Sequence, residues 1–193
     1  MFQVSSFKFQ RQKGFTMIEM LVVVAIVAIL PTIIVANFPQ IRLQFALSRA
    51  TYSFAQDTRR AQGMSISSNL YKDSNGNVQP VSGYGVYVNM DNGNKKYIIY
   101  ADVYPGNRQY DELIDYVVQT IDIAASEPGV IIKQLDNIFG NIVSINFNPP
   151  DPTTTIAQLF EQEHVLDVIF ALESDPSITK TVSINTSGLI EVK

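Results

Sequence analysis

The chain has no cysteine and no tryptophan, and it has a single histidine. Without cysteine there can be no disulfide, no thiolate nucleophile and no thiolate ligand for a metal. The absence of cysteine does not identify the cellular compartment, because exported proteins can also lack disulfides. Charge is scarce too, since 17% of the residues are charged against about 25% in typical soluble domains. Much of this deficit lies between Phe15 and Phe38, where Glu19 is the only charged side chain.

Basic residues are outnumbered over most of the chain. The 193 residues include 14 basic and 18 acidic side chains, a formal net charge of −4. Without Lys8, Arg11 and Lys13 of the first fourteen residues, 11 basic side chains face 18 acidic ones, and the net charge is −7. The net negative charge of the chain after residue 14 argues against general nucleic-acid binding, which depends on neutralising phosphates. The sequence also has no glycine-rich phosphate loop and no catalytic-triad spacing, so we expect no enzymatic activity and no catalytic cofactor.

An apolar run of 24 residues extends from Phe15 to Phe38. As a helix it would be about 36 Å long at ~1.5 Å per residue, which is enough to cross a bilayer. The basic flank predicts a single-pass orientation with the N-terminus in the cytoplasm, which Arg42 and Arg49 after the run weaken slightly. A secretory signal peptide is the rival interpretation, but its apolar core is usually about 7–15 residues long.

Helical periodicity continues beyond the apolar run. Apolar or small side chains recur at helical spacing, namely Ile41, Phe45, Ser48, Tyr52 and Ala55. Charged residues supply the other side of the helix, namely Arg42, Arg49, Asp57, Arg59 and Arg60. The pattern predicts one long helix over about 15–70, with a transmembrane and assembly segment over about 15–38 and an amphipathic upper half. Pro31 and Pro39 should kink or loosen it, because proline lacks the backbone donor.

Short alternating runs dominate residues 71–193. They read YGVYVNM, KYIIYAD, YVVQTIDI, VIIK, IVSINF, VLDVIFAL, KTVSIN and LIEV, and the turn signal DNGN separates the first two. In IVSINF, the apolar side chains alternate with Ser144 and Asn146, which should lie on the opposite face. The pattern predicts a small antiparallel β domain with one packed face per sheet, so the fold class is α+β. The stretches 72–83 and 148–155 read as loops.

The head of the apolar run has a distinctive order of residues: Lys13, Gly14, Phe15, Thr16, Met17, Ile18 and Glu19. This order, after a short basic leader and at the start of a spanning helix, resembles the type IV prepilins. The resemblance implies that a membrane prepilin peptidase cuts between Gly14 and Phe15 and methylates the new N-terminus of Phe15. Residues 1–14 would then be a leader. Glycine suits a bond that an enzyme must approach closely.

Glu19 is the one acid of the run, and removing a carboxylate from water is costly unless it finds a partner. Cleavage would turn the Phe15 nitrogen into an amine that is charged near neutral pH. The resemblance implies that Glu19 pairs with the Phe15 amine of a neighbouring subunit. In an apolar core such a pair must offset two desolvations, so it acts best as a register device between subunits. The alternative is an interfacial carboxylate paired with Lys13 or water.

A second, looser resemblance concerns the middle and the end of the chain. Residues 47–69, the runs YGVYVN and YIIYAD, and the final KTVSINTSGLIEV look like the GspH/FimT group of minor pseudopilins. That group has a long N-terminal helix followed by an all-β domain. It occurs in type II secretion pseudopili and in type IV pili. The chain departs from related pilins in carrying Pro31 and Pro39 where a single proline is common, and in lacking the C-terminal disulfide loop of many major pilins.

The loop ADVYPGNRQYDE contains oxygen-bearing side chains of the kind that bind Ca²⁺, namely Asp102, Asn107, Asp111 and Glu112. Some pseudopilins bind calcium, so the resemblance makes this loop a candidate cation site. The spacing does not match an EF-hand, and a plain acidic turn is the alternative. His164 lies beside Glu161 and Glu163, and we expect a solvated turn there rather than a metal site.

Four arginines lie along the predicted upper helix: Arg42, Arg49, Arg59 and Arg60. They could contact extracellular DNA, as minor pilins in DNA uptake do. The alternative is that they solvate the helix and pair with acids of the β domain or of neighbouring subunits. Because weak phosphate contacts depend strongly on salt, these two interpretations predict different salt dependence.

Together these features predict a structural subunit, a pseudopilin or minor pilin of a type II secretion pseudopilus or a type IV pilus. The expected partners are prepilin peptidase, other pilin subunits, the inner-membrane assembly platform with its ATPase, and membrane lipid before assembly. The precursor would lie in the inner membrane and the mature subunit in an extracytoplasmic filament. Two alternatives remain: a bitopic membrane protein with an external β binding domain, and a secreted β protein with a signal peptide.

Overall fold

The computed structural model describes residues 14–67, 70–72, 76–149 and 154–193, and it leaves the side chains of residues 33–37 undescribed. The chain divides into two compact units, Met1–Ile41 and Arg42–Lys193. The sequence predicts a boundary near residue 70, whereas the division falls inside the long helix. The reason is that helical residues from Ala46 onward belong to the core of the second unit. The basic part of the predicted leader, residues 1–13, lies outside the described residues.

Helix α1 is a single element of 50 residues, Met17–Ile66, so the predicted long N-terminal helix is confirmed. Pro31 and Pro39 both lie inside it, and the helix continues through each of them. The loosening expected at the prolines therefore does not appear as a break. Each proline removes one backbone hydrogen bond, while the neighbouring turns keep theirs. Close to the first proline, the Thr32 hydroxyl adds a bond of 2.9 Å to the Ala28 carbonyl.

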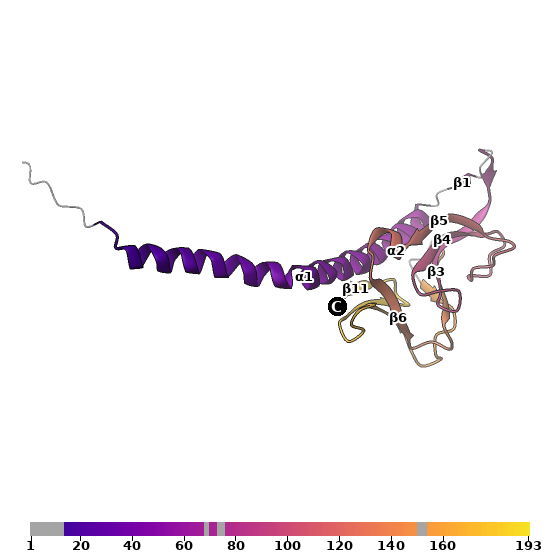
Figure 1. Ribbon diagram of the computed structural model, residues 1–193. Coiled ribbons are helices and arrows are strands. Elements are labelled where there is room, and N and C mark those ends of the chain that lie inside the picture. The colour runs from indigo at the N-terminus through magenta and orange to yellow at the C-terminus, as the bar shows by residue number, and fades with distance from the viewer. Residues whose placement is uncertain (1–13, 68–69, 73–75, 150–153) are drawn as a thin grey trace, which may run out of the picture. The chain divides into compact units, whose positions relative to one another are not determined.

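Antiparallel strands follow α1, as Figure 1 shows, and the α+β class is confirmed. The strands are β1 (Tyr71–Lys72), β2 (Val78–Gln79), β3 (Val81–Asn89), β4 (Lys96–Val103), β5 (Tyr116–Asp122), β6 (Val130–Asp136), β7 (Ile142–Phe147), β8 (Thr154–Ile156), β9 (Val165–Leu172), β10 (Thr179–Asn185) and β11 (Ile190–Val192). A single-turn helix, α2 (Ile123–Ser126), joins β5 to β6. Each of the eight predicted runs forms a strand, whereas β1, β2 and β8 lie in or beside stretches that the sequence predicts as loops.

The strands form two main sheets and a small hairpin. The five-stranded sheet has the order β5-β4-β3-β7-β8, and the four-stranded sheet has the order β11-β10-β9-β6. Strands β3 and β4 form the hairpin predicted from DNGN, with Tyr87 opposite Ile98. Strands β1 and β2 pair only with each other among the described strands. Because β9 pairs with β6 and β10, the second sheet brings together segments far apart in sequence.

The core of the second unit lies where residues 42–66 of α1 meet the two main sheets. The ring of Phe54 is fully buried, with its centre 4.9 Å from that of Tyr97 on β4 and 5.4 Å from that of Phe170 on β9. The buried face of the helix is made largely of small residues, namely Ala46, Leu47, Ala50, Thr51, Phe54, Ala55, Thr58, Ala61 and Ser65. Small side chains let a helix approach a sheet closely and leave little empty volume.

The apolar side that the sequence predicts for the upper helix is, in most positions, not the side that packs against the sheets. Ile41, Phe45 and Tyr52 are exposed, Ser48 is half-buried, and Ala55 alone is fully buried. The pattern misleads because the large apolar residues lie one position away from the buried stripe. The consequence is an outward apolar surface on the upper helix that the β domain does not cover.

The last turns of α1 are attached to the five-stranded sheet by one serine. The Ser65 hydroxyl donates to the Phe147 carbonyl and accepts from the Tyr84 amide at 3.1 Å. Nearby, Gly85 allows a close approach that no other residue would permit. A Cβ on Gly85 would lie 2.4 Å from the Ile145 carbonyl oxygen and 2.6 Å from the ring of Tyr100.

Strand β7 is buried on both faces, which corrects the expectation of one packed face per sheet. Ser144 and Asn146, predicted to face solvent, are buried beneath the connection between β4 and β5. The ring of Tyr110 from that connection lies 5.2 Å from the ring of Tyr100, and its amide donates to the Ser144 hydroxyl at 3.0 Å. Alternation along β7 could not reveal this, because the covering residue Tyr110 lies 34 residues from Ser144 in sequence.

Candidate functional site

The first candidate site is the start of α1, where Thr16 caps the helix. The Glu19 carboxylate accepts hydrogen bonds from the Thr16 amide and the Thr16 hydroxyl, each at 3.1 Å. In return the Glu19 amide donates to the Thr16 hydroxyl at 3.2 Å. This reciprocal arrangement is a capping box, which satisfies amide groups that have no partner within the helix. The Glu19 carboxylate also lies at the positive end of the helix dipole, which stabilises an anion.

This capping role of Glu19 is absent from the sequence interpretation, which pairs Glu19 with another subunit, with Lys13 or with water. The signal was present as threonine followed three residues later by glutamate before an apolar run. Within a single chain, Glu19 therefore already has a partner at the start of its own helix. That partner does not exclude a second one, because a carboxylate can accept several hydrogen bonds.

The bond between Gly14 and Phe15 lies just ahead of the helix and is open to solvent. Both residues are exposed, Phe15 at 79%, and no described atom lies within 4 Å of the position that a Cβ on Gly14 would take. Neither residue is part of α1, which begins at Met17. A peptidase could thus reach this bond without unwinding the helix.

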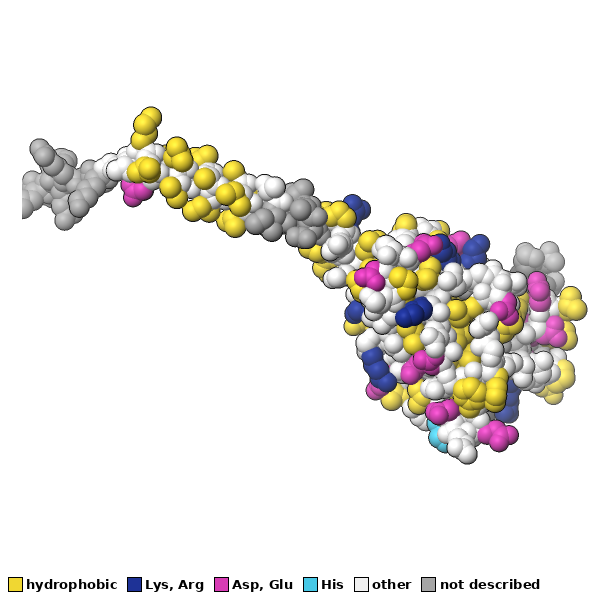
Figure 2. Space-filling view, turned by 60° about the horizontal axis from the view of Figure 1, so that its bottom comes forward, with side chains coloured by type: hydrophobic (Ala, Val, Ile, Leu, Met, Phe, Trp, Pro, Cys, Tyr) yellow, Lys and Arg dark blue, Asp and Glu magenta, His cyan; other side chains and the backbone are white. Residues whose placement is uncertain are grey.

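Beyond the cap, the first part of α1 is apolar and uncovered. The large hydrophobic side chains from Met17 to Leu30 are 49–93% exposed. Figure 2 shows hydrophobic side chains on the described surface of this segment. A membrane span is predicted over 15–38, but no helix in the described residues meets the combined length and hydropathy expected of a membrane span. The transmembrane assignment of this segment therefore stays a prediction.

Three of the four residues of the candidate cation loop accept hydrogen bonds from nearby backbone amides. Asp102 belongs to β4 and is buried, where its carboxylate accepts from the Arg108 amide at 3.1 Å and from the Asn146 side chain at 3.2 Å. Asn107 and Asp111 each accept a bond from an amide two residues further along. Over the described ranges, no group of three or more histidine, cysteine, aspartate or glutamate side chains is placed to hold a metal. The loop uses its acids to shape its own backbone, and we do not propose calcium binding.

Asp102 is a buried carboxylate whose pKa is raised well above its usual range. Burial, with a smaller contribution from the charge of Asp115, raises its pKa to about 6, and hydrogen bonds from the Arg108 amide and Asn146 limit the rise. Asp115 accepts from the Val103 amide at 2.9 Å and from the Asp111 amide at 2.7 Å. Burial raises the pKa of Asp115 as well. Together the two carboxylates hold both ends of the connection between β4 and β5.

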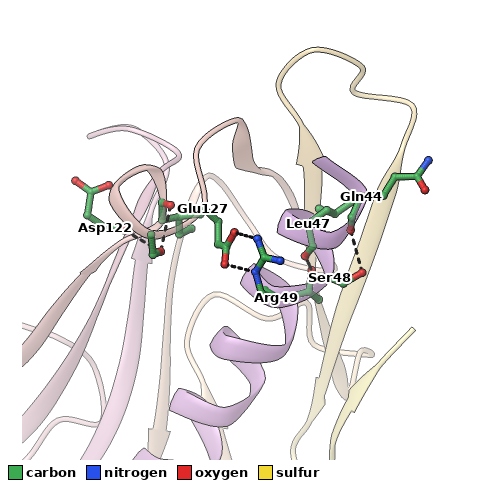
Figure 3. A network of polar contacts seen from close by, with 9 residues as sticks. Gln44, Leu47, Ser48, Arg49, Asp122 and Glu127 are labelled. Carbon is green, nitrogen blue, oxygen red and sulfur yellow. Dashed lines mark hydrogen bonds and ion pairs between the residues drawn. The ribbon is translucent and has the colours of Figure 1, made fainter. Parts of the chain in front are cut away.

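Three of the four arginines of the upper helix, Arg49, Arg59 and Arg60, contact the β domain. Arg49 forms a two-pronged ion pair with Glu127 (Figure 3), and both nitrogen–oxygen distances are 2.6 Å. Arg59 donates to the Ile190 carbonyl at 2.7 Å, and Arg60 donates to Gln119 at 2.8 Å. These contacts favour the interpretation that the arginines bind the β domain. We do not propose a nucleic-acid site.

His164 is exposed, and the contact recorded for it is made by its backbone carbonyl, which accepts from the Thr186 amide at 2.9 Å. It belongs to the turn that leads into β9, as the sequence predicts. No metal-binding group within the described part of the chain includes it.

Residues 9–34 match the family described as the prokaryotic N-terminal methylation motif. The matched segment includes the bond between Gly14 and Phe15, the capping box and most of the apolar run. The motif indicates a precursor of the type IV pilin or pseudopilin kind. It implies processing by prepilin peptidase and assembly with other pilin subunits, and it occurs in structural pilin-like proteins. Comparison with curated proteins and with solved structures gave no match.

Proposed function

We propose that the chain is a minor pseudopilin of the GspH/FimT type, a structural subunit of a type II secretion pseudopilus or a type IV pilus. Prepilin peptidase removes residues 1–14 and methylates the amine of Phe15. The helix then packs among the helices of other subunits, while the β domain lies on the filament surface. The order of one long helix followed by antiparallel sheets supports this type.

The observation that carries the proposal is the bare apolar helix directly after the methylation motif. Covering one exposed side chain such as valine or leucine stabilises by about 1.5–3 kcal/mol. From Met17 to Leu30 the single chain leaves its large hydrophobic side chains uncovered. Helices of other subunits, which bear the same kind of surface, can bury this segment along its length.

Membrane lipid would cover the same surface before assembly. In that state the precursor lies in the inner membrane with the N-terminus in the cytoplasm, as the basic residues before Gly14 favour. The assembly platform and its ATPase would supply the work of moving the subunit into an extracytoplasmic filament. The chain has no nucleotide-binding motif of its own.

Glu19 would have two partners in succession. In the precursor it caps α1 through Thr16. Cleavage leaves the Thr16 amide intact, because the broken bond lies between Gly14 and Phe15. The Phe15 amine of a neighbouring subunit would then meet a carboxylate already held in place, so less side-chain entropy is lost on pairing.

Mass spectrometry of the protein isolated from cells tests the processing step. The expected mature chain begins at Phe15 and carries one methyl group on its amine, and both features require prepilin peptidase. A chain that keeps Met1 would support the bitopic membrane protein instead. A chain that begins near Ala36 to Pro39 would support secretion after signal-peptide removal.

A second experiment tests the assembly role. The change Glu19→Ala should leave cleavage intact and reduce the amount of the subunit in sheared filaments. Glu112→Gln in an exposed loop serves as the matched control, because it also removes one acid. Normal incorporation of the Glu19 variant would contradict the pairing. A subunit present in far fewer copies than the main filament protein is expected for the minor type, and equal abundance would contradict it.

A further inference from the structure

The β domain carries a groove of about 250 Å³ on the outer side of the five-stranded sheet. Tyr87, Ile98 and Thr120 contribute to its lining and form one row across β3, β4 and β5, since Tyr87 lies opposite Ile98 and Ile98 lies opposite Thr120. Tyr110 and Glu112, from the connection between β4 and β5, line it as well. All of these residues belong to the second compact unit.

Two tyrosine rings give the groove an angled aromatic surface. The rings of Tyr87 and Tyr110 have centres 4.6 Å apart and planes 41° apart, so they do not cover each other completely. Each is held in place by the protein. Asn89 donates to the Tyr87 hydroxyl at 3.0 Å, and the Tyr110 amide donates to the Ser144 hydroxyl at 3.0 Å. A binding surface fixed in advance loses little entropy when a ligand arrives.

Polar groups at the groove are available for a ligand. The side chains of Asn92, Glu112 and Thr120 line it, and none of them makes a hydrogen bond to the rest of the described chain. Together they offer an amide, a carboxylate and a hydroxyl group, which both donate and accept. The Tyr110 hydroxyl is also without a bond in the described residues, and burial raises its pKa, so it stays protonated and can donate.

The charges around the groove select against anions. Lys96 lines it, but its amine lies 3.3 Å from Asp122, and Glu112 adds a second negative charge. The local sum is therefore negative, which repels phosphate and carboxylate ligands. A neutral ligand with one apolar face and several hydroxyl groups fits both the rings and the polar groups.

We propose that this groove binds a neutral sugar, with its C–H face on Tyr87 and Tyr110 and its hydroxyl groups at Asn92, Thr120 and Glu112. The volume is below the ~300–1,000 Å³ typical of pockets for drug-sized ligands, so about one sugar ring is enclosed. A filament subunit with such a groove would display a glycan-binding surface. The proposal does not depend on assembly, because every residue it uses lies in the second unit.

The test uses the purified full-length chain in a detergent whose headgroup carries no sugar. An array of neutral, acidic and amino glycans identifies the bound class, and saturation-transfer NMR with the best neutral glycan measures the affinity. Tyr110→Ala should weaken binding at least about tenfold, since truncating an aromatic anchor is among the costliest changes at a binding site. Thr120→Lys, at an exposed position, should also block the groove without touching the core.

Tyr52→Ala is the matched control, because Tyr52 is an exposed aromatic residue on α1 outside the groove. It should leave the affinity unchanged. The proposal is overturned if no neutral glycan binds, if only acidic or amino glycans bind, or if both groove variants bind as tightly as the native chain. Binding of a proline-rich peptide in place of a glycan would also overturn it, since tyrosine-lined grooves recognise such segments too.

Discussion

One threonine hydroxyl couples the start of α1 to the only acid in the apolar run. Thr16 both donates to Glu19 and accepts from its backbone, so the carboxylate is held over the first turn of the helix. Without this contact Glu19 would sample several rotamers. In the proposed filament the orientation of Glu19 sets how readily it meets an incoming amine, so Thr16 acts as a positioning residue.

Replacing Thr16 by valine keeps the shape of the side chain and removes its hydroxyl. An N-cap substitution of this kind costs about 1 kcal/mol of helix stability. We expect Thr16→Val to be cleaved normally and to enter sheared filaments less efficiently than the native chain. Thr16→Ser, which keeps the hydroxyl, should restore incorporation. Equal incorporation of the valine and serine variants would show that the cap plays no part in assembly.

At the scale of elements, α1 has two parts with opposite surroundings. Its large side chains from Met17 to Leu30 are uncovered in the single chain, whereas Leu47 and Phe54 are buried in the second unit. The ion pair of Arg49 with Glu127 adds little to this attachment, because the Arg49 side chain is 61% exposed and exposed pairs are weak. Apolar contact therefore holds the upper helix, and the arginines fix its orientation.

Phe54→Ala tests this account of the upper helix. The ring is fully buried between aromatic residues of both sheets, so its loss should reduce the free energy of unfolding of the second unit by about 3–5 kcal/mol. Urea unfolding of the full-length chain in detergent, followed by tyrosine near-ultraviolet circular dichroism, measures the change. Tyr52→Ala, two residues away and 51% exposed, should cost far less. Similar losses for both variants would contradict the assigned face of the helix.

The sequence predicts elements better than it predicts their surroundings. Alternation along single segments located the eight longer β runs, because the period of a strand is a local property. The buried face of the upper helix was misassigned, since Phe45 and Tyr52 are larger than the alanines that contact the sheets. The capping box at Thr16 could have been predicted, because threonine followed three residues later by glutamate is its sequence signature. The burial of Asn146 could not be predicted, because its side chain donates to the Tyr100 hydroxyl on β4, a residue distant in sequence.

At the scale of the molecule, acid stability should reflect the buried Asp102. Its pKa rises from 3.8 to about 6 in the folded chain, mainly because burial disfavours the charged form. Between these two values the folded state binds a proton that the unfolded state releases. The contribution of Asp102 to stability is therefore fully present below pH 4 and is lost as the pH rises through 6. Asp115, whose pKa is also raised, acts in the same direction.

Asp102→Asn removes this titration while keeping the size of the side chain. The free energy of unfolding of the native chain, relative to this variant, should fall between about pH 4 and pH 6 by on the order of 2–3 kcal/mol and stay level above pH 7. Urea unfolding at a series of pH values measures it. Asp175→Asn is the control, because hydrogen bonds from Ser177 lower the pKa of Asp175, so its contribution is lost as the pH falls. If the difference in unfolding free energy between the native chain and Asp102→Asn does not change with pH, folding does not raise the pKa of Asp102. The connection carrying Tyr110 would then be held without electrostatic cost.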